Sequence, residues 1–451
     1  MLRLAIVLSL VMVMTPVLWG QWRVGRAEVD ITPPARMPMA GYYYVRLNEG
    51  THDPLHAKAM VVEQAGVRMA LVAVDYVQIP RALVEEARAL IAARTGIPAT
   101  HVMISATHSH TGPELGARLR SVEPEIDALA KGFWKRIPEL IAASVEKAVA
   151  GLALSEISVG VGREETISFI RRFRMIDGTT GWNPGKRNAK IVQPLGAIDP
   201  DVAVVAAGKG VYVNFALHLD TVGGAQFSAD YVDALSRSLR AVKGSEFSTL
   251  FTIGCAGNIN HIDVSHNRSQ KGHGEAARIG TVLAAAVLKT MERMTPVEPQ
   301  PVRVSTRVVA LPPTPYTAEE AERAKVVVAN YGKQNANPFY EQVNAFKVMD
   351  LMELGKRSVE AEVQVIALGK SVAWVGLPGE IFVEHGRAIK LASPFPVTIV
   401  AELANANLGY VPDRKAYAEG AYEVISSRLA VGGGELMVAA AVEQLNALFR
   451  D

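Results

Sequence analysis

The sequence predicts an α/β protein with a mixed β-sheet core flanked by helices. Two observations carry this prediction. Short apolar runs of strand-like composition alternate along the chain with segments whose apolar residues recur at helical spacing. In addition, residues 69–110 contain a strand, a helix and a second strand with short connections, which is the pattern of a βαβ unit.

The first twenty residues are typical of a secretory signal. Arg3 precedes an apolar run from Leu4 to Leu18, and the small residue Gly20 follows as a cleavage point. A membrane anchor is the alternative, but the run is shorter than the roughly 20 residues that a spanning helix needs. We therefore expect a secreted or periplasmic protein whose mature chain starts near Gln21.

The elements that follow are predicted from turn residues and apolar spacing. The segment "QAG" marks a turn between two strands, and Gly96 ends a helix whose apolar spacing is about 3.6 residues. Pro33 and Pro34 end the first strand. The expected strands are 22–34, 57–63, 69–76 and 99–110, and the expected helices are 80–96 and 124–149.

The same criteria apply to the rest of the chain. Residues 295–315 are rich in proline and valine, and they either join two lobes or form an edge strand. We expect residues 21–451 to form one domain, with this junction inside it. The expected strands are 157–165, 203–208, 211–220, 361–369, 371–380 and 395–412, with one more running into a Gly/Asn loop over 250–263; the helical segments are 275–291 and 317–359.

Composition narrows the classes of function. The chain has 451 residues, of which 49% are hydrophobic and 20% charged, and its net charge is +2. Because it has no long basic run, we expect no nucleic-acid partner. Cys255 is the only cysteine, so no intrachain disulfide can form.

Two of the ten histidines, His108 and His110, stand at the end of the strand in "ISATHSHTGPELG". Alternate residues of a strand point to the same side, so both rings should project together. Neighbouring imidazoles are favourable where a metal ion accepts their lone pairs. Hydrogen bonding of both rings into a loop is the alternative. The position favours function, because open α/β sheets place their sites at the C-terminal ends of strands.

Three further strand ends carry side chains that can bind a metal. His218 and Asp220 alternate in "VNFALHLDTVGG", and Glu380 follows the strand in "VAWVGLPGEIF". A third strand, in "ELANANLGYVP", ends with Asn405, Asn407 and Tyr410. Each residue has an ordinary structural explanation, such as a core histidine or a helix-capping carboxylate. Their coincidence at strand ends favours a metal site at the C-terminal ends of the strands.

The segments "GRAEVDITPP", "THDPLHAKAM", "ISATHSHTGPE", "NFALH", "LPGE" and "YVPDRKAYAEGAYE" occur in the order found in neutral/alkaline non-lysosomal ceramidases. The chain resembles the catalytic domain of that family from about Val24 to Glu423. The resemblance implies one Zn²⁺ per chain, held by His108, His218, Glu380 and Tyr410. It also implies that His110, Tyr422 and Arg171 face the substrate, although Arg172 is adjacent to Arg171.

The family resemblance implies a zinc-dependent hydrolase that cleaves the amide bond of ceramide or a related N-acyl lipid by a metal-activated water. Such an enzyme binds a small-molecule substrate, and the sequence leaves open whether it also contacts a membrane surface peripherally. Two departures keep other functions open: Asn258 to His261 replace the Asp-Val-Ser-Pro segment of many ceramidases, and the β-sandwich that follows their catalytic domain is not expected here. The alternatives are a metal-dependent amidase or esterase on a non-sphingolipid acyl substrate, and a secreted binding protein without activity.

Three further expectations concern residues around this centre. Cys255 in "IGCAGN" faintly resembles a nucleophile elbow, but a buried, inert thiol is the preferred interpretation. Either Asp75 or Asp220 could orient a ligand histidine, with loop capping as the alternative. The loop 38–56 and its flank could line the acyl chain, or simply pack as a surface loop, through Met37, Met39, Tyr42, Tyr43 and Tyr44.

Overall fold

The computed structural model describes residues 21–116, 123–331 and 337–450. The predicted signal, residues 1–20, lies outside this part of the chain. Within this part of the chain, every helix is too short or too polar to cross a bilayer.

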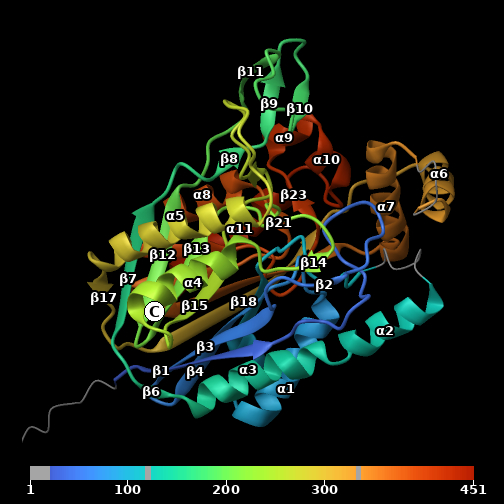
Figure 1. The fold of residues 1–451 in the computed structure, drawn as a ribbon. Coiled ribbons are helices and arrows are strands. Elements are labelled where there is room, and N and C mark those ends of the chain that lie inside the picture. Colours follow the sequence, from blue (N-terminus) through green and yellow to red (C-terminus); the bar gives the residue numbers. More distant parts are fainter. Residues whose placement is uncertain (1–20, 117–122, 332–336, 451) are drawn as a thin grey trace, which may run out of the picture.

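Three mixed sheets form the centre of the molecule (Figure 1). Each contains one parallel pair among its described strands, namely β4–β5, β13–β15 and β20–β22, and its other pairs are antiparallel. The mixed α/β class predicted from the sequence is thereby confirmed.

The first sheet has the order β5 (Val102–Ala106), β4 (Val67–Val74), β3 (His56–Gln64), β1 (Arg23–Asp30), β6 (Ala153–Leu154). The second has the order β15 (Ser248–Ile253), β13 (Gly210–Phe215), β12 (Asp201–Ala207), β7 (Ile157–Arg163), β17 (Thr295–Pro296). The third has the order β18 (Val302–Leu311), β19 (Val359–Leu368), β20 (Val372–Gly376), β22 (Val397–Ala401).

Helices cover the outer side of each sheet, and apolar side chains from all three sheets share one inner core (Figure 1). Helix α3 (Ile137–Ala150) packs on the first sheet with α1 (Arg81–Thr95) against it, α4 (Tyr231–Lys243) and α5 (His273–Met291) pack on the second, and α8 (Val383–Ala392) and α11 (Gly433–Arg450) pack on the third. The inner core includes Met60, Leu71, Met103, Tyr212, Leu250, Ile366, Trp374 and Ile399. Each sheet therefore lies between helices and the inner core, although the edge strand β18 of the third sheet is partly exposed.

Several smaller elements complete the fold. Helix α6 (Ala318–Ala329) begins at a capping box formed by Thr317 and Glu320, and it packs on α7 (Phe339–Leu354). The three-stranded sheet of β9 (Arg172–Met175), β10 (Thr180–Trp182) and β11 (Ile191–Pro194) projects from the body (Figure 1). The short elements are β2 (Gly50–Thr51), β8 (Phe169–Ile170), β14 (Gln226–Phe227), β16 (Ile259–Asn260), α9 (Arg414–Glu419) and the 3₁₀ turn Ala99–His101.

The structure corrects several predicted boundaries. The helix expected over 124–149 is two helices, α2 (Pro124–Trp134) and α3, because Pro138 lacks an N–H and its ring would clash with the preceding turn. The strand expected over 395–412 ends at Ala401. Residues 302–311 form the edge strand β18, which is one of the two roles expected for the 295–315 segment. The division of the chain into domains stays a prediction.

The ends of the parallel strands bring distant segments together. An isolated bridge joins Ser109, after β5, to Leu219, after β13, and a second joins Ser105 to Ala404, after β22. Beyond β20 and β22, two short parallel strands, β21 (Glu380–Ile381) and β23 (Tyr410–Val411), place Glu380 opposite Tyr410. These connections put the C-terminal ends of strands from all three sheets at one place.

Candidate active site

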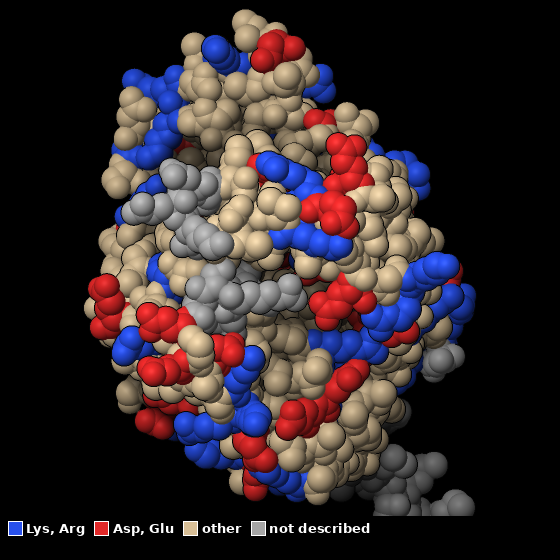
Figure 2. All heavy atoms as spheres, turned by 90° about the vertical axis from the view of Figure 1, so that its right-hand side faces the viewer, with Lys and Arg blue, Asp and Glu red and all other residues tan. Residues whose placement is uncertain are grey.

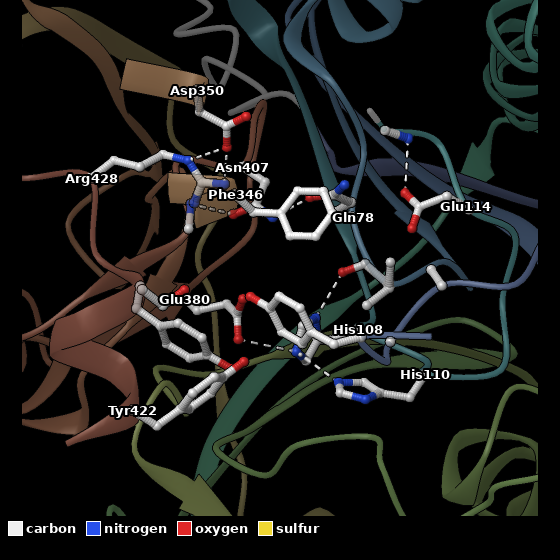
Figure 3. Close-up of a pocket in the computed structure, with 18 residues that line it drawn as sticks. Gln78, His108, His110, Glu114, Phe346, Asp350, Glu380, Asn407, Tyr422 and Arg428 are labelled. Carbon is white, nitrogen blue, oxygen red and sulfur yellow. Dashed lines mark hydrogen bonds and ion pairs between the residues drawn. The ribbon is translucent and has the colours of Figure 1, made fainter. Parts of the chain in front are cut away.

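Four of the predicted site residues converge on one point, and three of them, His108, His110 and Glu380, line a pocket (Figure 3). The Nε2 atoms of His108 and His218 lie 3.0 Å apart, and Glu380 Oε2 lies 3.4 Å and 3.5 Å from them. His110 Nε2 lies 3.2 Å from His108 Nε2. The structure thus brings together residues that the sequence places at three separate strand ends.

The two neighbouring histidines do not converge by strand alternation. Strand β5 ends at Ala106, and His108 has a φ of 77°, in the left-handed region that few residues other than glycine adopt. Gly41, whose φ is 96°, lies so close that a Cβ there would come within 2.7 Å of the His110 Cβ. A strained turn and a closely packed glycine therefore aim the two rings.

Backbone carbonyls orient the rings of His108 and His218. His108 Nδ1 lies 2.7 Å from the carbonyl oxygen of Val77, and His218 Nδ1 lies 3.0 Å from that of Ala256. A carbonyl can only accept a hydrogen bond, so each Nδ1 carries the proton and each Nε2 presents a lone pair. The expectation that Asp75 or Asp220 orients a ligand histidine is wrong for these two rings, because both ring N–H groups are taken by carbonyls.

The arrangement fits a divalent cation. The Nε2 lone pairs of His108 and His218 face each other and repel unless a cation lies between them. Burial, followed by the charges of Arg171 and His108, lowers the pKa of His218 to about 4, so this ring is neutral near pH 7. Glu380 Oε2 is buried and has no hydrogen-bond donor among the described residues. Zinc bonds of about 2.0–2.1 Å in tetrahedral geometry separate ligand atoms by about 3.4 Å, which is close to the distances found here.

Two contacts compete with a cation. Arg171 Nη1 lies 3.3 Å from His218 Nε2 and can satisfy that lone pair. His110 Nε2, which lies 3.2 Å from His108 Nε2, can donate to it in one of its tautomers. Glu380 Oε2 has no donor among the described residues, so the case for a cation rests on that oxygen.

A second histidine cluster, made of His52, Asp53 and His273, differs in geometry. Its two imidazole rings stack with centroids 3.5 Å apart and planes 12° from parallel. The in-plane lone pairs of stacked rings run side by side and do not converge. Among the described residues, the centre at His108 and His218 is therefore the stronger candidate for a metal site.

Two tyrosines border the centre. The Tyr410 hydroxyl interacts with the Glu380 carboxylate and the Arg171 guanidinium, and burial followed by Glu380 raises the pKa of Tyr410 well above its usual value. Tyr422 stands at the start of α10 (Tyr422–Ser426). Its ring meets the Tyr410 ring edge-on, with the ring centroids 5.3 Å apart, and it packs on the Trp182 ring, with the centroids 4.4 Å apart. Tyr410 therefore stands beside the predicted ligands, and Tyr422 lies one ring further out, in the pocket wall.

Arg171 points into the centre and Arg172 points away from it. Arg171 Nε donates to Glu423 Oε1 at 2.9 Å and its Nη2 donates to the Gly257 carbonyl at 2.7 Å. Arg172 Nη1 donates to Glu423 Oε2 at 2.9 Å, and its guanidinium lies over the Phe382 ring. The adjacent pair is thus distinguished by geometry. Sequence reasoning missed Glu423, whose only signal was its place directly after Tyr422.

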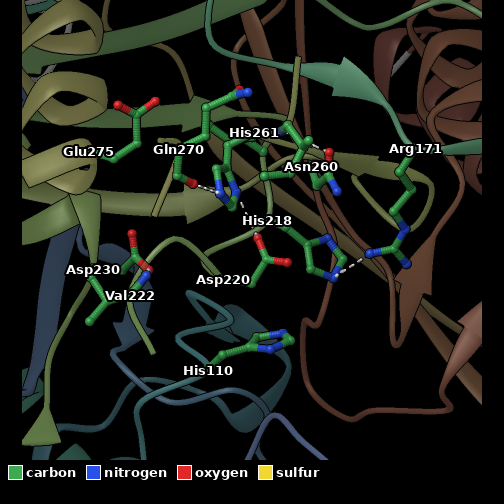
Figure 4. Close-up of polar contacts among 12 residues, drawn as sticks. His110, Arg171, His218, Asp220, Val222, Asp230, Asn260, His261, Gln270 and Glu275 are labelled. Atoms are coloured by element: carbon green, nitrogen blue, oxygen red, sulfur yellow. Dashed lines mark hydrogen bonds and ion pairs between the residues drawn. The ribbon is translucent and has the colours of Figure 1, made fainter. Parts of the chain in front are cut away.

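Asp220 pairs with His261 beside the centre (Figure 4). His261 Nδ1 lies 3.0 Å from Asp220 Oδ1, and His261 Nε2 lies 2.8 Å from the carbonyl oxygen of Gln270. Both ring nitrogens face oxygen acceptors, so both carry protons and the ring is an imidazolium. Burial lowers the His261 pKa, but the hydrogen bond and charge of Asp220 outweigh it and leave the pKa raised. Figure 4 shows His110 on the other side of Asp220.

Cys255 and Asn405 lie away from this chemistry. Cys255 is buried against Gly386, and burial raises the pKa of its thiol well above the usual value. The prediction of a buried thiol is confirmed.

Asn405 accepts from the Ile104 N–H at 2.9 Å and donates to Gln364 at 2.8 Å, so it joins β5 to the third sheet.

The pocket above the centre has a volume of about 310 Å³. Met37 and Met39, expected to line it, are buried in the helix-covered core of the first sheet, so that expectation is wrong for both. Of the three adjacent tyrosines, Tyr43 lines the pocket, whereas Tyr44 is 56% exposed. The described lining is Ala40, Gly41, Tyr43, Val77, Gln78, His108, His110, Glu114, Gly116, Phe346, Asp350, Glu380, Asn407, Gly409, Tyr410, Tyr422, Ser426 and Arg428.

Comparison with known proteins gives one family and one fold. Residues 22–171 match the family described as neutral/alkaline non-lysosomal ceramidase, N-terminal. The crystal structure of neutral ceramidase from Pseudomonas aeruginosa is similar with a TM-score of 0.72 and 20% identity, over 96% of this chain and 75% of that one. A ceramidase complexed with C2 gives a TM-score of 0.73 and 19% identity, over 96% and 76%. At these identities the structures establish the fold. No curated protein matches the chain.

Proposed function

We propose, from the match of residues 22–171 to the neutral/alkaline non-lysosomal ceramidase family, that the chain is a zinc-dependent hydrolase of the amide bond in an N-acyl lipid or related acyl-amide. One observation carries the proposal: the Nε2 atoms of His108 and His218 lie 3.4 Å and 3.5 Å from Glu380 Oε2, and that oxygen has no hydrogen-bond donor among the described residues. A metal centre of this kind can cleave a linear amide when a donor for the amide oxygen and a proton for the leaving amine are also at hand.

We assign one zinc ion to His108, His218, Glu380 and Tyr410. When bound there, zinc supplies a Lewis acid and a water whose pKa falls to about 7. The phenol of Tyr410 is the least committed of the four donors, because its pKa is raised by burial and Glu380. Two observations support its assignment: Tyr410 pairs with Glu380 on the short β21–β23 ladder, and its hydroxyl interacts with the Glu380 carboxylate.

Three residues are assigned to the substrate. Arg171 is a buried cation held in place by Glu423, so it can stabilise negative charge that develops on the amide oxygen without reorganising. Tyr422 presents a hydroxyl donor from the pocket wall. His110 is neutral, because burial and then His108 lower its pKa well below the usual value, and it is placed to pass a proton to the leaving amine.

Export and contact with a membrane surface accompany this proposal. Export depends on residues 1–20, and the family resemblance supports it. The proposal includes no nucleic-acid partner. On the face drawn in Figure 2, acidic and basic side chains are interspersed, so the phosphate backbone of a nucleic acid would meet both signs of charge there.

The proposal is tested by metal content and activity together. We expect elemental analysis of the purified chain to find about one zinc, and expect His108→Ala and Glu380→Ala to lose zinc and amide hydrolysis together. His101→Ala is the matched control, because His101 lies on the 3₁₀ turn before β5 and its ring binds the Arg68 carbonyl. A zinc-free protein with full activity contradicts the proposal.

A further inference from the structure

A second pocket, of about 580 Å³, lies at the opposite end of the second sheet from the candidate active site. Its lining includes Gly210 and Ser248, the first residues of β13 and β15, whereas His218 follows the other end of β13. Residues of β1 and β6 form its other side, at the lower left of Figure 1. A ligand held in this pocket is therefore separate from the metal centre.

Arg26 brings a positive charge to this pocket from the apolar face of β1. Its register partner on β3 is Met60, and Val24, two residues earlier on the same face, is buried with Met60 in the inner core. Arg26 Nη2 lies 3.2 Å from Met60 Sδ, its Nη1 donates to the Ala207 carbonyl, and its Nε is buried without a hydrogen-bond partner among the described residues. Gly210 makes room for the side chain, because a Cβ there would come within 2.9 Å of Arg26 Nε. An arginine thus occupies a position whose pattern calls for an apolar residue.

The guanidinium of Arg26 has no counter-charge within ion-pair distance in the part of the chain that the structure describes. Glu28, the acidic residue two positions along β1, is used by Arg240, whose Nη2 donates to both Glu28 oxygens at 2.8 Å. Burial lowers the pKa of Arg26 to about 10. A partly buried cation without a partner destabilises the fold, and an anion beside it removes that cost.

The charges of the lining fit a monoanion. Glu28 and Arg240 neutralise each other, which leaves Arg26, Lys209 and Glu246 as the other charged side chains of the described lining, with a net charge of +1. A carboxylate brings one negative charge and matches the planar fork of a guanidinium. A phosphate dianion brings two charges and would be repelled by Glu246.

The remaining walls are apolar, with one hydroxyl. Val24, Leu154 and Phe247 supply hydrocarbon surface, and Leu154 is 67% exposed. The Ser248 hydroxyl lines the pocket and has no hydrogen bond to the other described residues. A ligand that carries a hydrocarbon tail next to its charged group would cover this surface and gain by removing it from water.

We propose that this pocket binds an aliphatic monocarboxylate, with the carboxylate at Arg26 and a short tail against Leu154 and Phe247. The site goes beyond the proposed amide hydrolysis and does not depend on it. Lys209, on the exposed turn between β12 and β13, adds a second positive charge near the carboxylate.

Titration calorimetry of the full-length protein with sodium hexanoate tests the site. We expect hexanoate to bind wild type at least about tenfold more tightly than Arg26→Met, because the variant loses the charged hydrogen bonds. Hexanol has the same tail without the charge, and acetate has the charge without the tail. Each should bind at least about tenfold more weakly than hexanoate, and inorganic phosphate should also bind more weakly.

A zinc ion at the metal centre can also bind a carboxylate, so the titration is repeated in His108→Ala. Hexanoate binding should persist in this variant with an unchanged affinity. Lys209→Ala should weaken hexanoate by about two- to fivefold, since the lysine is exposed. Lys209→Ala keeps the test valid if Arg26→Met folds poorly.

Melting temperatures distinguish a binding arginine from a merely structural one. Without hexanoate, Arg26→Met should melt at the temperature of wild type or above it, because an apolar side chain of similar length replaces an unpaired charge. Hexanoate should raise the melting temperature of wild type but not that of Arg26→Met. Arg293→Met is the control, because Arg293 is an exposed residue outside the pocket and hexanoate should stabilise this variant as it does wild type.

Three results would overturn the proposal. They are the absence of hexanoate binding to wild type, an equal affinity in wild type and Arg26→Met, and a loss of binding in His108→Ala, which would place the carboxylate at the metal centre. Tighter binding of phosphate than of hexanoate would overturn the monocarboxylate class.

Discussion

At the scale of single residues, the His261–Asp220 pair is the feature that most distinguishes this centre. His261 belongs to the segment Asn258 to His261, which the sequence predicts to depart from the pattern of the family that the chain resembles. Because both nitrogens of His261 face acceptors, the ring holds a positive charge beside a carboxylate whose side chain is 24% exposed. The pair fixes the position of Asp220 between His218 and His110.

Replacing His261 with phenylalanine should lower the free energy of unfolding by about 2 kcal/mol, because it leaves Asp220 and the Gln270 carbonyl without a donor. The His261 pKa is raised on folding, so this stabilisation is full below its unfolded pKa and is lost as pH rises through the folded value. Burial raises the pKa of Asp220 but His261 lowers it further, so the carboxylate contribution is lost only in acid. The difference between wild type and variant should therefore be largest between about pH 4 and 6.5.

Urea unfolding at pH 5.5 and pH 9 measures this difference. His266→Phe is the control, because His266 forms a more exposed pair with Asp263 in the same loop and should change stability by less than about 1 kcal/mol. A difference that grows toward alkaline pH would show that His261 is neutral.

Cys255 tests whether covalent chemistry contributes. Its thiol is 3% exposed and its pKa is raised well above the usual value by burial, so it should resist iodoacetamide at pH 8 in the native protein and react in urea. Cys255→Ser should keep turnover within a few-fold of wild type. Loss of turnover with zinc still bound would favour a cysteine nucleophile instead.

At the scale of elements, Glu423 joins two segments that are far apart in the sequence. It accepts from Arg171 and from Arg172 at the start of β9, and it belongs to the short helix α10 that carries Tyr422. Its side chain is fully buried, and each oxygen binds one guanidinium. The assigned arginine and the assigned tyrosine are therefore positioned by one carboxylate.

Glu423→Gln should cost about 3–5 kcal/mol in unfolding free energy, because buried Arg171 loses its ion pair and buried Arg172 keeps only its pair with Glu419 at 3.4 Å. Hydrolysis should lose mainly kcat, since Arg171 is displaced, while zinc content stays at about one per chain. Glu360→Gln is the matched control, because its ion pair with Arg81 is 58% exposed on the carboxylate side and should contribute less than about 1 kcal/mol. Unchanged stability and unchanged kcat in Glu423→Gln would remove Glu423 from this role.

Elements with strong local signals could be predicted from the sequence. The strands on either side of "QAG" and the helix ended by Gly96 follow from turn chemistry and periodicity, and the structure confirms them within one to two residues. The break at Pro138 was also present in the sequence, but the continuous apolar spacing on both sides concealed it. The pairing of Glu380 with Tyr410 was not predictable, because the parallel register of β21 and β23 depends on how the third sheet packs.

At the scale of the whole molecule, the candidate ligands were predictable by residue type, and their convergence was not. His108, His218 and Glu380 each follow a strand of a different sheet, and only the packing of three sheets around one core brings their donor atoms within about 3–3.5 Å. The burial of Met37 and Met39 in the core was not predictable for the same reason, because tertiary packing decides which side of their loop faces the core.

This architecture predicts that metal removal weakens the whole fold. A cation held by residues after β5, β13 and β20 binds the folded chain and not the unfolded one, so it stabilises the chain by RT ln(1 + [Zn]/Kd), or about 4 kcal/mol at a free concentration 1,000-fold above Kd. Chelation should therefore lower the melting temperature measured by calorimetry, and added zinc should restore it. His108→Ala should melt at the same temperature with and without chelator, which separates loss of the bound ion from other effects of the chelator. If wild type also melts unchanged after chelation, no ion ties the three sheets together, and the close approach of His108, His218 and Glu380 must be stabilised by protonation instead.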